Sequence, residues 1–181
     1  MKHLILLFVV LLSQSVASEK CLRHYGQVYC QVFSSERKGV QTFEFLLRKE
    51  SLESWTKMIT IKKYKNKHFL KDVLPDYMNS VRSMFALKPE LFSNPQSKYK
   101  ENMMILLTLL APDKSHYEYV VNHFYNSGDG PITSIFYSHR LPFAEKIDFT
   151  EVMKKNQFWM LSLAKIDVDG VLKIDVAKGG D

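Results

Sequence analysis

Six stretches of this chain either alternate apolar and polar residues or stay apolar over the length of one β-strand. Alternation with a period of two turns the apolar side chains toward one side of a pleated strand. Polar turns that contain glycine or proline separate neighbouring stretches, as in antiparallel hairpins. The stretches that predict strands are 25–33, 40–47, 55–61, 103–110, 117–125 and 132–141.

Two other stretches carry helical spacing. Between Phe69 and Leu87 the apolar residues recur every three or four positions, which is typical of one face of an amphipathic helix. Pro75 lies inside this pattern, so the helix either starts late, with Pro75 in its first turn, or is kinked there. Near the C-terminus, Asp148 or Thr150 can cap a last helix. Its apolar stripe comprises Val152, Met153, Trp159, Met160, Leu163 and Ala164.

The order of these elements is three strands, a helix, three strands and a helix. It predicts an α+β fold: an antiparallel sheet of about six strands, in two three-stranded groups, with two helices packed on one face. Residues 18–181 are expected to form a single domain, a normal length for one hydrophobic core. After Ala164 the Asp169-Gly170 turn signal predicts either a small hairpin or a loose tail over residues 166–181.

The first 17 residues have the order of a secretory signal peptide. Lys2 and His3 form a basic start, Leu4–Leu12 is apolar throughout, and the stretch Ser13–Ala17 is small and polar. This predicts cleavage after Ala17, with Ser18 as a second possible site, whereas the alternative is a buried N-terminal helix. A transmembrane helix needs roughly 20 apolar residues, so no membrane anchor is expected after cleavage. The predicted location is the bacterial periplasm or the medium.

Cys21 and Cys30 are the two cysteines of the chain. Cys21 follows Ser18-Glu19-Lys20 rather than the apolar and small residues of a lipid-modification signal, so a lipid anchor is not expected. In an oxidising compartment the two cysteines can form a disulfide. Nine residues of straight strand would hold them about 30 Å apart, so the bond requires a chain reversal, for which Gly26 is suited. The alternative is an N-terminal thiol and a separately buried Cys30.

Charge argues against nucleic acid as a partner. Without Lys2, the 25 Lys and Arg residues become 24 against 19 Asp and Glu, a net charge of +5 that is spread along the chain. No basic region with the signature of a nucleic-acid-binding fold occurs. The densest cationic run is Lys62, Lys63, Lys65 and Lys67. It is expected either to protect an edge strand from aggregation or to form a docking patch for an acidic partner or for anionic lipid headgroups.

A metal site is not predicted from the histidines that remain after cleavage. A hairpin that turns through Asn126–Pro131 would place His123 opposite Ser134 and His139 opposite Glu118, so these two do not form a pair. Neither His-Glu-x-x-His nor Cys-x-x-Cys occurs. The histidines are His24, His68, His116, His123 and His139.

Other chemical motifs are incomplete. The start Asp167-x-Asp169-Gly170 resembles a calcium loop, but Leu172 stands where a glycine is expected and Lys178 where a glutamate is expected. No Gly-x-Ser-x-Gly elbow is present, and Gly128-Asp129-Gly130 is too short to cradle a phosphate. We therefore predict no catalytic, cofactor-binding or metal-binding residue and no cofactor. Trp55 and Trp159 are predicted to anchor the core.

One segment carries a family resemblance. The run Glu53-Ser54-Trp55-Thr56-Lys57-Met58-Ile59-Thr60, between a strand pair and a helix, resembles a "WTxMiT" group of small exported bacterial proteins. These are similar to the wider PsbP/DcrB-like α+β class, and the resemblance extends from Val28 to Ile166. It implies that α+β fold and a cell-envelope location. The class contains adaptors and accessory subunits without shared catalytic machinery, so no site residue is transferred.

Taken together, the sequence favours an exported, non-enzymatic protein of the cell envelope that contacts a protein partner through its sheet or loops. One alternative is a hydrolase or other enzyme with a spatially assembled site, which a cleft holding an activated serine or histidine would favour. The other is a carrier of a small apolar ligand, which a deep apolar cavity would favour.

Overall fold

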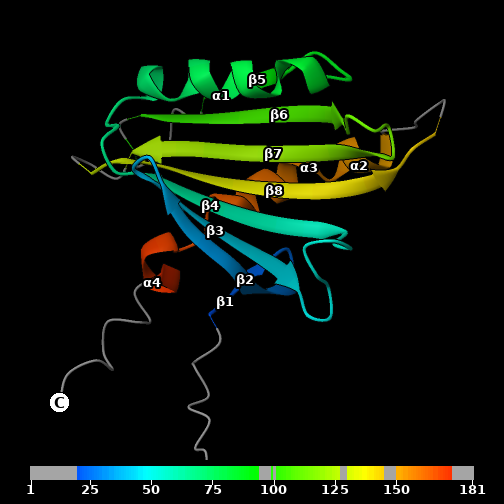
Figure 1. Cartoon of the computed structure of the whole chain (residues 1–181), viewed down its shortest axis with the longest axis horizontal. Helices are drawn as coiled ribbons and strands as arrows, with labels where there is room; N and C mark the ends of the chain where they lie inside the picture. The colour runs from blue at the N-terminus through cyan, green and yellow to red at the C-terminus, as the bar shows by residue number, and fades with distance from the viewer. Residues whose placement is uncertain (1–19, 94–98, 100, 127–129, 145–149, 173–181) are drawn as a thin grey trace, which may run out of the picture.

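The computed structural model describes residues 20–93, 99, 101–126, 130–144 and 150–172. Within these residues the strands form one antiparallel sheet of eight strands with the order β1-β2-β3-β4-β8-β7-β6-β5 (Figure 1). The sheet is continuous because β4 pairs with β8 along its whole length. The strands are β1 (Cys21–His24), β2 (Gln27–Arg37), β3 (Val40–Leu47), β4 (Lys57–Tyr64), β5 (Glu90–Phe92), β6 (Asn102–Leu110), β7 (His116–Asn126) and β8 (Ile132–Pro142).

The helices are short and lie on both sides of this sheet. One side is covered by α1 (Leu74–Val81), which continues from the 3-10 turn η1 (Leu70–Asp72) into the 3-10 turn η2 (Arg82–Met84). The other side is covered by α3 (Asn156–Leu163) and α4 (Val168–Leu172), with α2 (Thr150–Lys154) preceding α3. The longest described helices have eight residues, so none of them reaches the length that crossing a membrane requires.

The predicted fold class is therefore wrong. Over the residues that are described, one eight-stranded sheet carries short helices on opposite faces, in place of a six-stranded sheet in two groups with two helices on one face. The fold is closer to an all-β class. The additional strands are the edge strands β1 and β5, with four and three residues, lengths over which a period of two is hardly visible.

The helical predictions hold in part. Pro75 lies in the first turn of α1, as one of the two predicted arrangements has it. The periodic stretch 69–87 nevertheless supplies only one eight-residue α-helix between two 3-10 turns. In the tail, residues 168–172 form α4 rather than a hairpin, because Asp167 accepts a hydrogen bond from the Gly170 N–H at 3.0 Å and caps the helix. Asp148 and residues 173–181 lie outside the described residues.

The N-terminal hairpin confirms the predicted disulfide. Tyr25 and Gly26 have φ angles of 46° and 76° and form a two-residue turn that requires positive φ at both positions. The turn aligns Cys21 with Cys30, whose Cα atoms are 4.1 Å apart, and the two form a disulfide. The predicted signal peptide lies outside the described residues.

Each side of the sheet has its own hydrophobic core. We call the side covered by α3 and α4 the α3 face, and the side covered by α1 the α1 face. The α3 face buries Leu22, Tyr29, Phe45, Ile59, Ile61, Val121, Ile135, Tyr137, Trp159, Leu163 and Val168, among others. The α1 face buries Val73, Ile105, Leu107, Leu109, Val120, Phe124, Ile132 and Phe136.

Candidate functional site

Helix α3 is apolar on both of its sides. Trp159 and Leu163 point to the sheet and are 3% and 0% exposed, whereas Phe158 and Leu161 point to solvent and are 59% and 52% exposed. A helix on the surface of a soluble protein normally presents a polar outer face. The outer face of α3 therefore resembles a surface that another molecule covers.

The turn between β1 and β2 extends this apolar surface. The backbone N–H of Tyr25 donates to the Ser162 hydroxyl at 3.0 Å, which fixes the turn against α3. The Tyr25 ring, 47% exposed, lies 6.4 Å from the Phe158 ring between centroids. We call Tyr25, Phe158 and Leu161 the apolar patch. Two exposed cations, Lys155 and Lys165, flank α3 in the sequence.

Three histidines belong to the α3 face of the sheet: His24 and His123 are buried, and His139 is half-buried. His24 lies against Tyr137 with 4.7 Å between ring centroids, and His139 lies 5.8 Å from the Trp159 ring. Burial lowers the pKa of His24, His123 and His139 to about 4, and for His139 the charges of Lys57 and Lys155 add to this effect. At neutral pH these three side chains are therefore uncharged members of an aromatic core.

The β7–β8 register differs from the prediction by one residue. His123 pairs with Ile135 and His139 pairs with Tyr119, instead of Ser134 and Glu118. Across the described residues, no group of three or more His, Cys, Asp or Glu side chains is arranged to hold a metal ion.

A groove with a volume of about 340 Å³ lies on the α1 face, between α1 and the strands β3 and β4. Its charged residues divide between two walls. The sheet side contributes Lys38, Lys62 and Lys67, and the side of η1 and α1 contributes Asp72 and Asp76. Tyr64, Tyr77, Val40 and Val73 supply the apolar surface between them.

The four lysines of the predicted docking patch are thus distributed over different surroundings. Lys62 and Lys67 line the groove. Lys63 points to the α3 face, where it pairs with Asp169 at 2.7 Å, and Lys65 pairs with Glu36 at 2.7 Å. Alternation along β4 is the reason, because neighbouring residues of a strand point to opposite faces. Lys38, which the sequence did not single out, joins the groove through the turn between β2 and β3.

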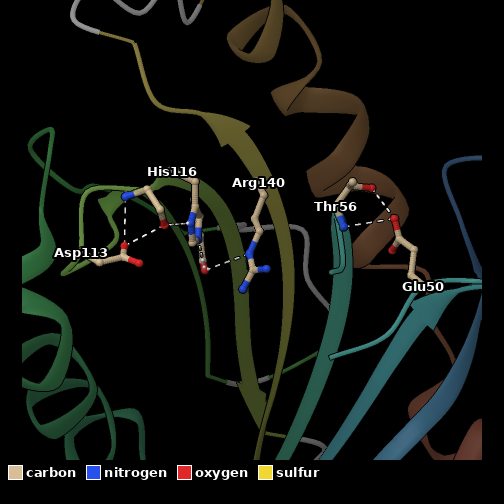
Figure 2. Close-up of polar contacts among 7 residues, drawn as sticks. Glu50, Thr56, Asp113, His116 and Arg140 are labelled. Atoms are coloured by element: carbon tan, nitrogen blue, oxygen red, sulfur yellow. Dashed lines mark hydrogen bonds and ion pairs between the residues drawn. The ribbon is translucent and has the colours of Figure 1, made fainter. Parts of the chain in front are cut away.

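Figure 2 shows a chain of polar side chains at the other end of β7 and β8. The Asp113 carboxylate accepts from the N–H and the hydroxyl of Ser115, at 3.0 and 2.7 Å. The same hydroxyl lies 2.7 Å from Nδ1 of His116, whose Nε2 lies 3.2 Å from Glu118. Arg140 lies 3.8 Å from Glu118 and places its guanidinium group over the Trp55 ring.

Serine, histidine and glutamate in this order invite comparison with a catalytic triad. The Ser115 hydroxyl has one proton, and the Asp113 carboxylate beside it has none to donate. The hydroxyl therefore donates to Asp113, and His116 must donate from Nδ1 to the hydroxyl oxygen. His116 cannot then remove the serine proton, as a general base of a triad would. We interpret this chain of contacts as a brace for the β6–β7 turn.

A second brace, also drawn in Figure 2, ties the segment before β4 together. The Glu50 carboxylate accepts from the N–H and the hydroxyl of Thr56. Trp55, next in sequence to Thr56, is 6% exposed and packs with Leu46 and Met58 in a small cluster apart from the two main cores. Trp159 lies in the core of the α3 face.

A protein-family model matches residues 16–168, which is most of the chain. The chain therefore belongs to this family, which is uncharacterised. Comparison with curated proteins and with solved structures found no match. The resemblance to the PsbP/DcrB-like class stays a prediction.

Proposed function

We propose that this chain is an exported, non-enzymatic interaction protein of the cell envelope and that the apolar patch contacts its protein partner. The observation that carries the proposal is the outer face of α3, where Phe158 and Leu161 are more than half exposed. Exposed apolar groups that gather on one surface are characteristic of interaction sites. The rings of Tyr25 and Phe158 are also the type of side chain that dominates binding energy at protein interfaces.

Charge around α3 restricts the partner. Lys155 and Lys165 are exposed and flank α3 in the sequence. A partner that buries Phe158 and Leu161 and presents acidic side chains at the rim would complement this surface. We therefore propose an acidic protein partner with an apolar centre to its binding surface.

Two features support the proposal that the protein is exported. The Cys21–Cys30 disulfide is typical of proteins that fold in an oxidising compartment, and the N-terminal residues have the pattern of a cleaved secretory signal. The resemblance to PsbP/DcrB-like proteins, which include adaptors and accessory subunits, is in keeping with an accessory role.

Site-specific photo-crosslinking in the native cells tests the interaction. A benzophenone side chain is placed at Phe158, at Leu161 or, as a control, at Leu91, which is 55% exposed on the edge strand β5. We expect one protein adduct from positions 158 and 161, none from 91, and loss of the adduct when Lys155→Glu is added. Equal adducts from position 91, adducts with lipid only, or no adduct at all would contradict the proposed protein partner.

The predicted export has its own test. Fractionation, N-terminal sequencing and thiol alkylation should find the protein outside the cytoplasm, beginning at Ser18 or Glu19, with both cysteines protected until a reductant is added. A cytoplasmic protein with reactive thiols would contradict export and leave the apolar patch to be judged by crosslinking alone.

A further inference from the structure

The groove on the α1 face presents opposite charges from its two sides. Lys62 lies on β4, Lys38 in the turn between β2 and β3, and Lys67 after β4, so the sheet side is cationic. Asp72 ends η1 and Asp76 lies in the first turn of α1, so the helix side is anionic. Sequence distance hides this arrangement, because it arises only when α1 packs over the strands.

These charges do not neutralise one another. In the part of the chain that the structure describes, none of the five charged side chains of the groove makes an ion pair. Lys63 and Lys65, their neighbours in sequence, both do. The two walls of the groove thus retain their charges across a space of about 340 Å³.

Lys62 is the lysine of the groove whose ammonium form is disfavoured by burial. Its side chain is half-buried, with the ammonium group 5.4 Å from the centroid of the Phe136 ring. Burial lowers the pKa of Lys62, and burial also raises the pKa of Glu44, the acidic residue whose charge favours the ammonium form. An anionic group of a ligand beside Lys62 would stabilise an ammonium group that has lost part of its hydration.

We infer that this groove binds a small zwitterion, namely a free amino acid or short peptide with an aromatic or aliphatic side chain. The carboxylate of the ligand lies beside Lys62 and Lys67, and its ammonium group lies beside Asp72 and Asp76. The apolar part of the ligand packs between Tyr64 and Tyr77. The volume is at the lower end of the range for small-molecule sites, which suits a ligand of this size.

Simpler ligands fit the groove less well. A plain anion would meet the two aspartates, and a plain cation would meet the three lysines. An apolar molecule would remove water from five charged groups without replacing it, which is costly. A zwitterion compensates both walls, so it differs from the apolar ligand that a carrier with an uncharged cavity would bind.

Three forms of one dipeptide separate these cases. Leu-Phe with free ends is compared with N-acetyl-Leu-Phe and with Leu-Phe-amide, which lack the positive and the negative end. Binding is followed by NMR chemical shifts of the Val40 and Val73 methyl groups in the mature protein. Since a charge-assisted contact contributes roughly 1.5–3 kcal/mol, we expect each blocked form to bind about tenfold or more weakly than the free dipeptide.

Two variants locate the contacts. In Lys62→Met the preference for the free dipeptide over its amide should shrink severalfold, because only Lys67 remains beside the carboxylate. In Asp76→Asn the preference for the free dipeptide over its N-acetyl form should shrink in the same way, because only Asp72 remains beside the ammonium group. Lys63→Met is the matched control, because Lys63 points to the other face, and it should bind like the wild type. Lys67→Met replaces Lys62→Met if the latter unfolds.

Specific results would overturn the inference. If the N-acetyl form binds as tightly as the free dipeptide, the site is one for anions, and if the amide does, it is one for cations. If none of the three shifts the Val40 and Val73 signals at millimolar concentration, the groove does not bind this class of ligand. The apolar patch lies on the opposite face, so any of these results leaves the proposed protein interaction to its own experiment.

Discussion

The two faces of the sheet bury polar groups in different ways. On the α3 face the ionisable rings of His24 and His123 are buried and that of His139 is half-buried, and burial lowers the pKa of all three so that they are neutral at pH 7. On the α1 face the fully buried Asn122 donates to the Tyr77 hydroxyl at 2.7 Å, and the charged groups stay at the groove. The comparison teaches that acid should destabilise the core of the α3 face more than that of the α1 face, because in the described part of the chain the buried rings that gain a proton between pH 7 and pH 4 lie on the α3 face.

The largest expected effect is the loss of unfolding free energy on acidification. Each of the three histidines has a pKa of about 4 in the folded protein, against an ordinary histidine pKa of 6.5 in the unfolded chain. Below pH 6.5 the unfolded chain therefore binds protons that the folded chain does not. Stability is present at neutral pH and falls as the pH drops toward 4, by up to about 1.4 kcal/mol per pH unit for each histidine. Urea unfolding at pH 7, 6 and 5 measures the loss.

Two variants separate this effect from that of other titrating groups. His24→Phe retains a ring beside Tyr137. It should reduce the loss of unfolding free energy on acidification by about one third, because the three histidines are expected to contribute equally. His68→Gln changes an exposed ring and should leave the loss unchanged. Equal pH profiles for the wild type and His24→Phe would show that the buried ring does not cause the sensitivity.

Truncation of the two cores comes next in size. Trp159→Ala removes a side chain that is 3% exposed in the core of the α3 face and should cost about 3–5 kcal/mol of unfolding free energy. Val73→Ala, at a site 4% exposed in the core of the α1 face, removes fewer atoms and should cost about 2 kcal/mol. Denaturant unfolding at pH 7 measures both. Equal costs would mean that the two cores are equally sensitive to truncation at these sites.

The last test, with an expected effect similar in size to that of Val73→Ala, concerns the hydrogen bond between Asn122 and Tyr77 on the α1 face. Tyr77→Phe removes the acceptor of the buried Asn122 amide and should cost about 1–3 kcal/mol. Replacing both partners, in Tyr77→Phe with Asn122→Leu, should recover part of this loss because no buried donor is left without an acceptor. A double variant less stable than Tyr77→Phe would show that Asn122 has a role beyond this hydrogen bond.

The local elements could be predicted from the sequence better than their assembly. Alternation or a continuous apolar run marks all six long strands, because a strand with one buried face repeats every two residues and a strand buried on both faces stays apolar. It does not show that β4 pairs with β8, since these strands are separated by α1 and by three strands. The short strands β1 and β5 are defined by their neighbours in the sheet rather than by their own composition.

The register between β7 and β8 was harder to predict than the strands themselves. The one-residue error in the β7–β8 pairing would have placed His123 and His139 on opposite faces, whereas both lie on the α3 face. A slip of one residue moves every side chain of a strand to the other face, and a long turn does not fix the register by itself.

The candidate sites show the same limit. The separation of Lys62 from Lys63 follows from alternation alone and was within reach of the sequence. The meeting of Lys62 with Asp76 was not, because it depends on where α1 packs. For α3 there was a signal: Phe158, Trp159, Leu161 and Leu163 cannot all lie on one side of a helix, so some of them had to face outward.

The Cys21–Cys30 disulfide makes the attachment of β1 to the sheet depend on the redox state of the surroundings. Four residue pairs hold β1 to the sheet, and the bond joins the outermost of them. While the thiols are reduced, only backbone pairing with β2 holds this edge strand, and β1 can separate from the sheet. Once the thiols are oxidised, β1 stays bound to β2. The paired part of β2 is then unavailable for pairing with a strand of another chain.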